Sequence, residues 1–191
     1  MDNIRGKTVA ITGAARGIGY ATAEALLKRG ARVVIGDRDV ALQESSVAKL
    51  TNLGSVSGYP LDVTDRESFA TFLDKARTDG GGHIDVLINN AADTAGGDLV
   101  TGDLAGIRST MESNYFGTLS MIRALAPILA RNGGGAILNV LSVAAWNTVS
   151  GNTAYAAAKA AEWGLTNGVR VELQGQGTLV TALMPGLIGT P

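Results

Sequence analysis

The chain contains no cysteine and only one histidine among its 191 residues. Without cysteine there are no disulfide bonds, no thiolate metal sites and no cysteine nucleophile. His83 follows a run of three glycines, and we interpret it as a loop residue. Zinc sites need several nitrogen or sulfur ligands together, and no second histidine is present. The sequence therefore predicts no metal site.

The chain also lacks an excess of charge and any long apolar run. A formal net charge of -1 gives no general reason to expect nucleic acid or an anionic membrane as a partner. No stretch approaches the roughly 20 apolar residues of a membrane span, and the N-terminus carries no apolar signal region. With 46% hydrophobic and 17% charged residues, the composition is typical of a globular protein. We expect a single domain over residues 1–191, located in the cytoplasm.

Short apolar runs alternate along the chain with segments of helical periodicity. The runs are predicted to be strands at residues 8–12, 32–36, 55–61, 84–89, 136–141 and 179–184. Helices are predicted at residues 17–29, at 40–53, from Asp65 onward, at 104–131 and at 153–174. Pro127 predicts a kink or an early break in the fourth helix. Strands that are apolar on both faces and separated by helices predict an α/β fold with a doubly wound parallel sheet and helices on both faces.

A glycine-rich segment joins the first predicted strand to the first helix. Gly13, Gly17 and Gly19 permit a tight turn, a close approach of backbone N–H groups to a pyrophosphate, and close packing of helix on strand. The positive end of the helix dipole would then face the phosphates. The alternative is an ordinary turn between strand and helix, which accounts for one glycine better than for three.

Asp37 ends the second predicted strand, about 20 residues after Gly17. A carboxylate there can accept hydrogen bonds from the adenosine ribose and would repel a 2′-phosphate, which favours NAD over NADP. Arg16 and Arg38 are close enough in sequence to bind that phosphate instead, so NADP stays open. A plain turn at Asp37 is the structural alternative.

Tyr155 and Lys159 are one turn apart on a predicted helix and share a face. A nearby ammonium, together with the positive nicotinamide of an oxidised cofactor, would lower the pKa of the phenol from about 10. The phenol could then exchange a proton with an alcohol oxygen as a general acid/base. Ser142 directly follows the fifth strand, and its hydroxyl could hold the reacting oxygen.

In this combination the chain resembles the short-chain dehydrogenase/reductase family, in its short single-domain branch. The matching pieces are Thr12-Gly13-x-x-x-Gly17-Ile18-Gly19, Asp62-Val63, Asn89-Asn90-Ala91, Asn114, Ser142, Tyr155-x-x-x-Lys159 and Pro185-Gly186. The resemblance covers essentially the whole chain. It implies a Rossmann-type fold that binds NAD(P).

The resemblance also implies roles for individual residues. The implied catalytic set is Asn114, Ser142, Tyr155 and Lys159, with Asn114 helping to hold a water that passes protons between Lys159 and solvent. Asp62 and Val63 would contact the adenine. The implied cofactor-binding set is Gly13, Arg16, Gly17, Ile18, Gly19, Asp37, Arg38, Asp62, Val63, Asn90, Ala91, Tyr155, Lys159, Pro185, Gly186, Ile188 and Thr190.

Two features depart from the family pattern. Ala92 replaces a glycine, and its methyl group could crowd the cofactor cleft. Family members usually continue past Pro191 with a lid helix, another helix and a seventh, edge strand. A chain truly ending there would expose an apolar sheet edge, so we expect the sequence to be part of a longer protein. By resemblance the alanine-rich segment 154–161 and the preceding long helix form a dimer contact, and tetramers are common in the family.

The function expected from these features is hydride transfer between a nicotinamide and a secondary alcohol/ketone pair. A sensor or scaffold that binds the cofactor without turnover is one alternative, and a related epimerase or dehydratase is another. Residues 144–147 are expected to line one wall of the substrate pocket, where Trp146 either packs on an apolar substrate or fills a loop or subunit contact. The substrate is left open beyond this class.

Overall fold

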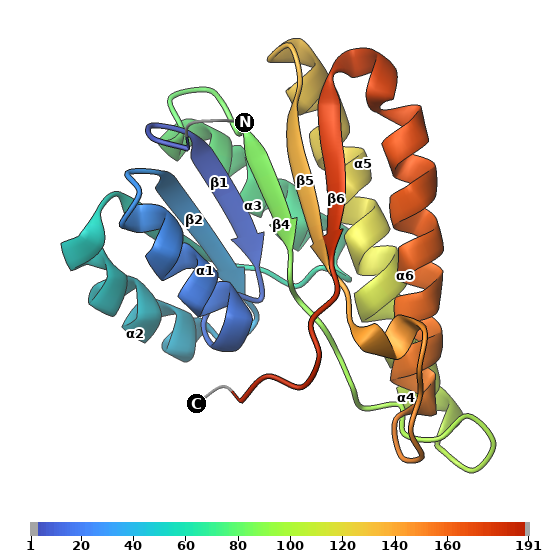
Figure 1. The fold of residues 1–191 in the computed structure, drawn as a ribbon. Coiled ribbons are helices and arrows are strands. Elements are labelled where there is room, and N and C mark those ends of the chain that lie inside the picture. Colours follow the sequence, from blue (N-terminus) through green and yellow to red (C-terminus); the bar gives the residue numbers. More distant parts are fainter. Residues whose placement is uncertain (1–3, 190–191) are drawn as a thin grey trace.

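The computed structural model describes residues 4–189 and contains a six-stranded parallel sheet in the order β3-β2-β1-β4-β5-β6 (Figure 1). The chain moves outward from β1 to β3 and then returns to pair β4 with the other side of β1. The switch point between β1 and β4 is where doubly wound sheets bind ligands, at the carboxyl ends of the strands. The strands are β1 (Thr8–Thr12), β2 (Arg32–Asp37), β3 (Val56–Pro60), β4 (Val86–Asn89), β5 (Gly135–Val140) and β6 (Thr178–Leu183).

Helices cover both faces of this sheet (Figure 1). On one face lie α1 (Gly17–Leu27) and α2 (Val40–Leu50). On the other lie α3 (Arg66–Asp79), α5 (Thr118–Arg131) and α6 (Thr153–Glu172). The predicted doubly wound α/β fold is confirmed.

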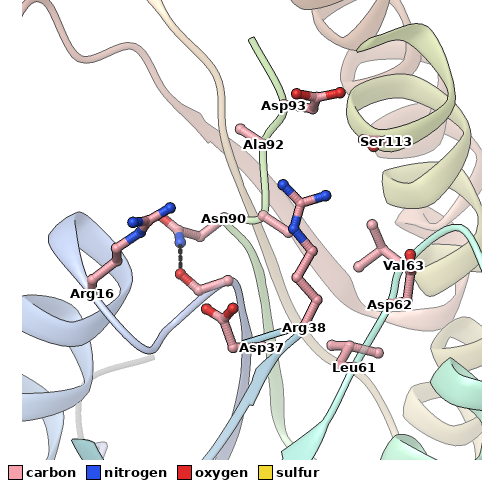
Figure 2. Close-up of a pocket in the computed structure, with 12 residues that line it drawn as sticks. Arg16, Asp37, Arg38, Leu61, Asp62, Val63, Asn90, Ala92, Asp93 and Ser113 are labelled. Atoms are coloured by element: carbon pink, nitrogen blue, oxygen red, sulfur yellow. Dashed lines mark hydrogen bonds between the residues drawn. The ribbon is translucent and has the colours of Figure 1, made fainter. Parts of the chain in front are cut away.

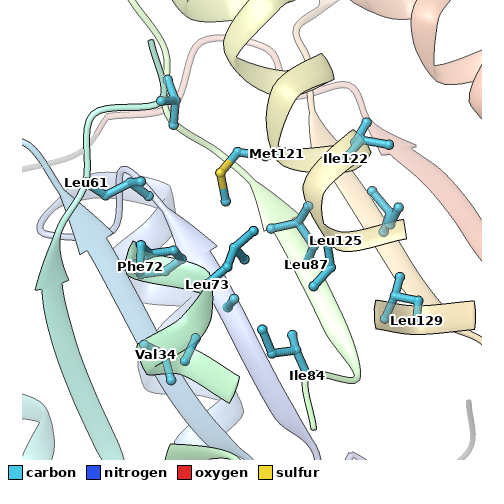
Figure 3. Close-up of a cluster of buried hydrophobic side chains, with 14 of the residues drawn as sticks. Val34, Leu61, Phe72, Leu73, Ile84, Leu87, Met121, Ile122, Leu125 and Leu129 are labelled. Atoms are coloured by element: carbon cyan, nitrogen blue, oxygen red, sulfur yellow. The ribbon is translucent and has the colours of Figure 1, made fainter. Parts of the chain in front are cut away.

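The central strand β1 supplies apolar side chains to both layers. Val9 and Ile11 belong to the core under α1 and α2, whereas Ala10 belongs to the core under α3 and α5. The alternation follows from the period of two in a strand, and a strand buried on both faces must be apolar throughout. Figure 3 shows the second of these cores, where Phe72 and Leu125 meet side chains of the sheet.

The predicted helix at 104–131 is divided differently from expectation. It consists of α4 (Leu104–Met111), a π-helical turn (Glu112–Gly117) and α5, without an intervening loop. The break expected at Pro127 does not occur, since α5 continues to Arg131. Met121, Leu125 and Leu129 are buried on one side of α5, and this packing outweighs the hydrogen bond that the proline cannot donate.

Other boundaries differ by up to three residues from those predicted. The second helix ends at Leu50 and continues as a 3-10 turn, Thr51–Leu53. Asp65 caps α3 rather than forming part of it, with its carboxylate accepting a hydrogen bond from the Glu67 N–H. Within residues 4–189, none of the helices combines the length and the apolar character needed to cross a membrane.

Candidate active site

The loop after β1 is shaped by glycines that have no room for a side chain. Gly13 adopts a φ of 62°, and a Cβ placed on it would lie 2.6 Å from the Ala91 Cα. A Cβ on Gly19 would lie 2.6 Å from the Asn90 Nδ2 and 2.7 Å from the Gly13 carbonyl oxygen. The close approach of α1 to the ends of β1 and β4 thus requires glycine at both positions.

The same loop is held in place by the residues that follow β4. The Asn90 Nδ2 donates hydrogen bonds to the carbonyl oxygens of Thr12 (3.0 Å) and Gly13 (2.7 Å). Figure 2 shows how Asn90 lies in the cleft. In return, the Thr12 Oγ1 accepts from the N–H groups of Asn90 and Ala91, each at 3.0 Å. Because none of the described side chains caps the first turn of α1, its N–H groups remain available to an anion.

A cleft opens at this edge of the sheet and contains charges of both signs (Figure 2). Asp37 lies at its floor, with one carboxylate oxygen accepting from the Ala15 N–H (3.0 Å) and the other from the Asp39 N–H (3.1 Å). The exposed side chains of Arg16 and Arg38 lie to either side of it. Among the described residues neither arginine forms an ion pair with Asp37, so both guanidinium groups remain accessible to a phosphate.

The cleft brings together eight of the predicted cofactor-binding residues. They are Gly13, Arg16, Asp37, Arg38, Asp62, Val63, Asn90 and Ala91. Four lining residues were not in the predicted set: Leu61, Ala92, Asp93 and Ser113. Leu61 and Ser113 could have been found as neighbours of Asp62 and Asn114, since a cleft wall rarely uses a single residue of a loop.

Beyond the cleft, Ser142, Tyr155 and Lys159 lie near one another, after the carboxyl end of β5 and in the first turns of α6. Ser142 follows β5, its Oγ accepts from the Ala144 N–H (3.1 Å), and its side chain hydrogen-bonds with Tyr155. The Lys159 Nζ lies over the Tyr155 ring, 5.6 Å from its centroid. The structure therefore juxtaposes the serine, the phenol and the ammonium as their sequence pattern predicted.

The ammonium alone does not lower the pKa of the phenol as expected. Burial raises the pKa of Tyr155 above its usual value, and the hydrogen bond from Ser142 opposes this shift. The negative charge of Glu162 raises the pKa further. Sequence reasoning missed Glu162, a buried carboxylate 2.7 Å from the Lys159 Nζ. The signal available was its spacing, three residues after Lys159 on the same helix.

Asn114 lies in the π-helical turn between α4 and α5 and is fully buried. Its Nδ2 donates to the carbonyl oxygens of Asp93 and Thr110, both at 2.7 Å, while its Oδ1 has no hydrogen-bond partner within residues 4–189. π-helical turns occur frequently at functional sites. Because Asp93 lines the cleft, Asn114 connects the cleft wall to the helices beside Tyr155.

The segment after β6 is placed only in part beside these residues. The Pro185 carbonyl accepts from the Val143 N–H (3.0 Å), which fixes the segment next to Ser142. Ile188 lies instead in a hollow with Gly17 and Ile18 on the outer side of α1. Thr190, expected near the nicotinamide amide, is outside the described residues. Gly186 does not line the cleft.

Comparison with known proteins places this site in a family. The family model described as short chain dehydrogenase matches residues 7–191. The chain belongs to the short-chain dehydrogenase/reductase family. Its members are oxidoreductases that use NAD(P), and the predicted family membership is confirmed.

Relatives with names or structures are similar along nearly the whole chain. The chain is 31% identical to an uncharacterized oxidoreductase of Staphylococcus saprophyticus, covering all of this chain and 82% of that protein. It is 36% identical to the 3-oxoacyl-[acyl-carrier-protein] reductase of Thermotoga maritima, covering 98% and 76%. A solved structure of a 7α-hydroxysteroid dehydrogenase in complex with NADH and 7-oxo glycochenodeoxycholic acid matches with 32% identity and a TM-score of 0.92, covering 98% of this chain and 73% of that one.

Proposed function

We propose that the chain is an oxidoreductase that transfers hydride between a nicotinamide cofactor and a secondary alcohol/ketone pair, with Tyr155 as the general acid/base. The observation that carries this proposal is the grouping of Tyr155, Ser142 and Lys159 at the carboxyl edge of the sheet. Among similar proteins, one is named for reducing a 3-oxoacyl group, and another is a dehydrogenase that holds NADH and an oxo-steroid. Both names support a carbonyl or alcohol substrate.

The residues at the switch point fit a dinucleotide. A Cβ on Gly13 would fill the space against Ala91, and the uncapped first turn of α1 directs N–H groups toward the cleft. We propose that Gly13, Gly17, Ile18 and Gly19 form the pyrophosphate side of the site and that Asp62, Val63, Asn90 and Ala91 line the rest. The cofactor, when bound, supplies or accepts the hydride.

We propose NAD as the preferred cofactor. Asp37 presents a carboxylate at the cleft, which can accept hydrogen bonds from ribose hydroxyls and repels a 2′-phosphate. Arg16 and Arg38 line the same cleft, and their positive charges partly offset the repulsion between Asp37 and a 2′-phosphate. NADP is therefore expected to bind more weakly than NAD rather than not at all.

Each catalytic side chain then has a separate task. Tyr155 donates its proton to the carbonyl oxygen as the ketone is reduced, and it takes the proton back when the alcohol is oxidised. Ser142 hydrogen-bonds with Tyr155 and holds the reacting oxygen beside the phenol. Lys159 provides positive charge behind the phenol, and Asn114 holds the cleft loop through the Asp93 carbonyl.

We also propose that the chain forms a homodimer, or a tetramer built from dimers, through α6 and α5. The exposed side of α6 carries small residues at helical spacing, Ala157, Ala160, Gly164 and Gly168. A Cβ built on Gly164 would meet nothing within 4 Å in the single chain, so another helix could approach closely there.

Replacement of Tyr155 by phenylalanine tests the proposed chemistry. The Tyr155→Phe variant should lose about 10²–10⁴-fold in kcat, because the general acid/base is removed while the ring remains. The Kd of the cofactor should change little. Turnover is followed by nicotinamide absorbance with a panel of ketones and secondary alcohols.

A matched control is Tyr59→Phe, since Tyr59 lies on β3 and its hydroxyl bonds to Asp79 outside the cleft. This variant should retain turnover. Equal kcat values for Tyr155→Phe and the unmodified protein would refute the proposed mechanism. Cofactor binding without turnover on any substrate would favour a sensor or scaffold instead.

A further inference from the structure

A buried ion pair lies behind the proposed acid/base. Lys159 and Glu162 occupy adjacent turns of α6, and each is 1% exposed. The Glu162 Oε2 accepts a hydrogen bond from the Lys159 Nζ at 2.7 Å. At this separation, away from water, the carboxylate offsets much of the charge that the ammonium would otherwise present to the phenol.

Both partners are held by further hydrogen bonds. The Thr118 Oγ1 on α5 donates to the Glu162 Oε1 at 3.0 Å. The Lys159 Nζ also donates to the Val140 carbonyl at the end of β5, at 3.0 Å. An ammonium has three donors, so two of them are directed into the chain and one remains for a ligand or water.

The buried ion pair as a whole is not an evident source of stability. Burying an ion pair costs several kcal/mol per ion in desolvation, and apolar residues of similar volume often stabilise a core at least as well. The helix α6 is rich in alanine, the residue with the highest helix propensity, so helix formation does not require a charged residue at this position. A role in the chemistry of the neighbouring lysine is therefore the more economical explanation.

We propose that Glu162 is a positioning residue: it holds the Lys159 ammonium against β5 and offsets its charge, so that Tyr155 keeps its proton in the cofactor-free protein. The use of that proton in carbonyl reduction rests on the proposed function above. A site arranged in this way favours Tyr155 as an acid, and positive charge arriving with an oxidised cofactor would favour its ionised form.

The direction of the ionisation shifts agrees with this arrangement. Burial raises the pKa of Tyr155, and Glu162 adds to the shift through its charge. Burial also raises the pKa of Glu162, while the charge of Lys159 and the hydrogen bonds from Lys159 and Thr118 lower it.

Other charged groups on the elements around α6 are not among the causes of the pKa shift of Tyr155. Asp98, in the loop after β4, accepts hydrogen bonds from the Gly151 N–H and from the Thr153 hydroxyl at the start of α6. Arg170, near the end of α6, donates to the Val180 carbonyl of β6. The remaining charged side chains on α6 and the neighbouring elements are Asp93 in the same loop, Asp103 at the N-cap of α4, Arg108 on α4, Glu112 in the π-helical turn, Arg123 and Arg131 on α5, and Glu172 at the end of α6 itself. Of the described charged residues, only Glu162 shifts Tyr155 through its charge.

The test is a titration of Tyr155 in the protein without cofactor. Tyrosinate absorbance is recorded against pH, and the curve of a Tyr155→Phe protein is subtracted to isolate this phenol. The Glu162→Gln variant keeps an acceptor for the Lys159 ammonium but removes the negative charge. Its Tyr155 titration should move to lower pH by about one unit or more, since a tenfold change in an equilibrium constant is one unit of pKa.

Rescue and control variants separate charge from structure. Glu162→Asp should return the titration most of the way to its original position, because it restores the carboxylate. Glu24→Gln makes the same change at an exposed residue that pairs with Lys28, and it should leave the curve unchanged. Should Glu162→Gln fold poorly, Glu162→Ala provides a second variant. Its Tyr155 titration should also move to lower pH, because the negative charge is removed, and water can enter the space that the side chain leaves.

A pH profile gives a second readout where turnover is measurable. Ketone reduction needs the protonated phenol, so its rate falls as pH rises through the pKa of Tyr155. In Glu162→Gln this fall should begin at lower pH by the same shift. A lower Tm with an unchanged titration and an unchanged profile would reduce Glu162 to a structural residue and overturn the inference.

The two proposals can fail separately. Coincident titration curves for Glu162→Gln and the unmodified protein overturn the inference even if the protein reduces ketones. A shifted titration in a protein that turns over no substrate supports the role of Glu162 and refutes the proposed function.

Discussion

At the scale of single residues, Asp37 has a structural role and, in the proposed function, a role in cofactor recognition. Its two carboxylate oxygens accept the N–H groups of Ala15 and Asp39, which ties the phosphate loop to the end of β2. The same charge faces the cleft between Arg16 and Arg38. We therefore propose that cofactor preference depends on one negative group and two positive ones.

Replacing Asp37 by serine should shift the preference toward NADP. Serine retains a short acceptor for the Asp39 N–H, but it no longer repels a 2′-phosphate beside the two arginines. The ratio of kcat/KM for NAD to that for NADP should fall at least about tenfold, which corresponds to about 1.4 kcal/mol.

Asp39→Ser is the matched control for this change. Asp39 caps α2 by accepting from the Leu42 N–H (3.0 Å) and does not line the cleft. Serine is also a good N-cap, so this variant should keep its stability and its cofactor ratio. An unchanged ratio in Asp37→Ser would show that the arginines, rather than the carboxylate, decide the preference.

At this scale the sequence predicted the candidate catalytic residues better than the burial and the charges around them. The pairing of Tyr155 with Lys159 follows from helical spacing alone, because residues four apart share a face. Glu162 has a similar spacing, but its burial depends on α5 and β5, which lie far away in the sequence. The predicted effect of Lys159 on the phenol pKa missed this third charge and the desolvation that comes with burial.

At the scale of elements, the strand–helix junction after β1 is tightly constrained by its neighbours. A Cβ on Gly13 would meet the backbone of Ala91 in the loop after β4, and a Cβ on Gly19 would meet the Asn90 side chain and the backbone of Gly13 and Ala14. The sequence pattern predicted this turn, because only glycine permits such an approach and the glycines recur at the required places.

Gly19→Ala should destabilise the protein and weaken cofactor binding together. The added Cβ would lie 2.7 Å from the Gly13 carbonyl oxygen and 2.8 Å from the Ala14 Cα, so the loop must move. Overpacking of this kind costs about 1–3 kcal/mol, measurable by urea unfolding. Gly175→Ala is the control, since a Cβ there meets nothing within 4 Å and its unfolding free energy should change by less than about 0.5 kcal/mol. Equal effects of the two substitutions would contradict the close approach.

The helix from α4 to α5 illustrates what periodicity does not reveal. The sequence predicted one long helix and placed its irregularity at Pro127, where the backbone lacks a donor. The structure places the irregularity at the π-helical turn around Asn114, and α5 passes through Pro127. A π-helical turn changes the register by about one residue, which leaves a periodic apolar pattern almost intact and therefore gives little signal in the sequence.

At the scale of the whole molecule, the doubly wound parallel sheet was predictable because each local signal agreed with the others. Apolar runs, helical periodicity and the junction glycines all favour parallel strands joined by helices, and the six predicted strands are present. Contacts between two copies of the chain leave no comparable signal in the sequence. Exposed small residues on α6 allow an interface but are also compatible with a solvated helix.

Light scattering coupled to size-exclusion chromatography decides this last proposal. The protein should elute with at least twice the 19.5 kDa mass of one chain. Gly164→Arg should reduce this mass, because a long charged side chain would stand between helices that approach closely at α6. Arginine favours helix more than glycine does, so the variant should remain folded. Gly175→Arg, at an exposed position after α6, should retain the original mass. A single-chain mass for the unmodified protein would exclude both the dimer and the tetramer, and an assembly that tolerates Gly164→Arg would place the interface on another surface.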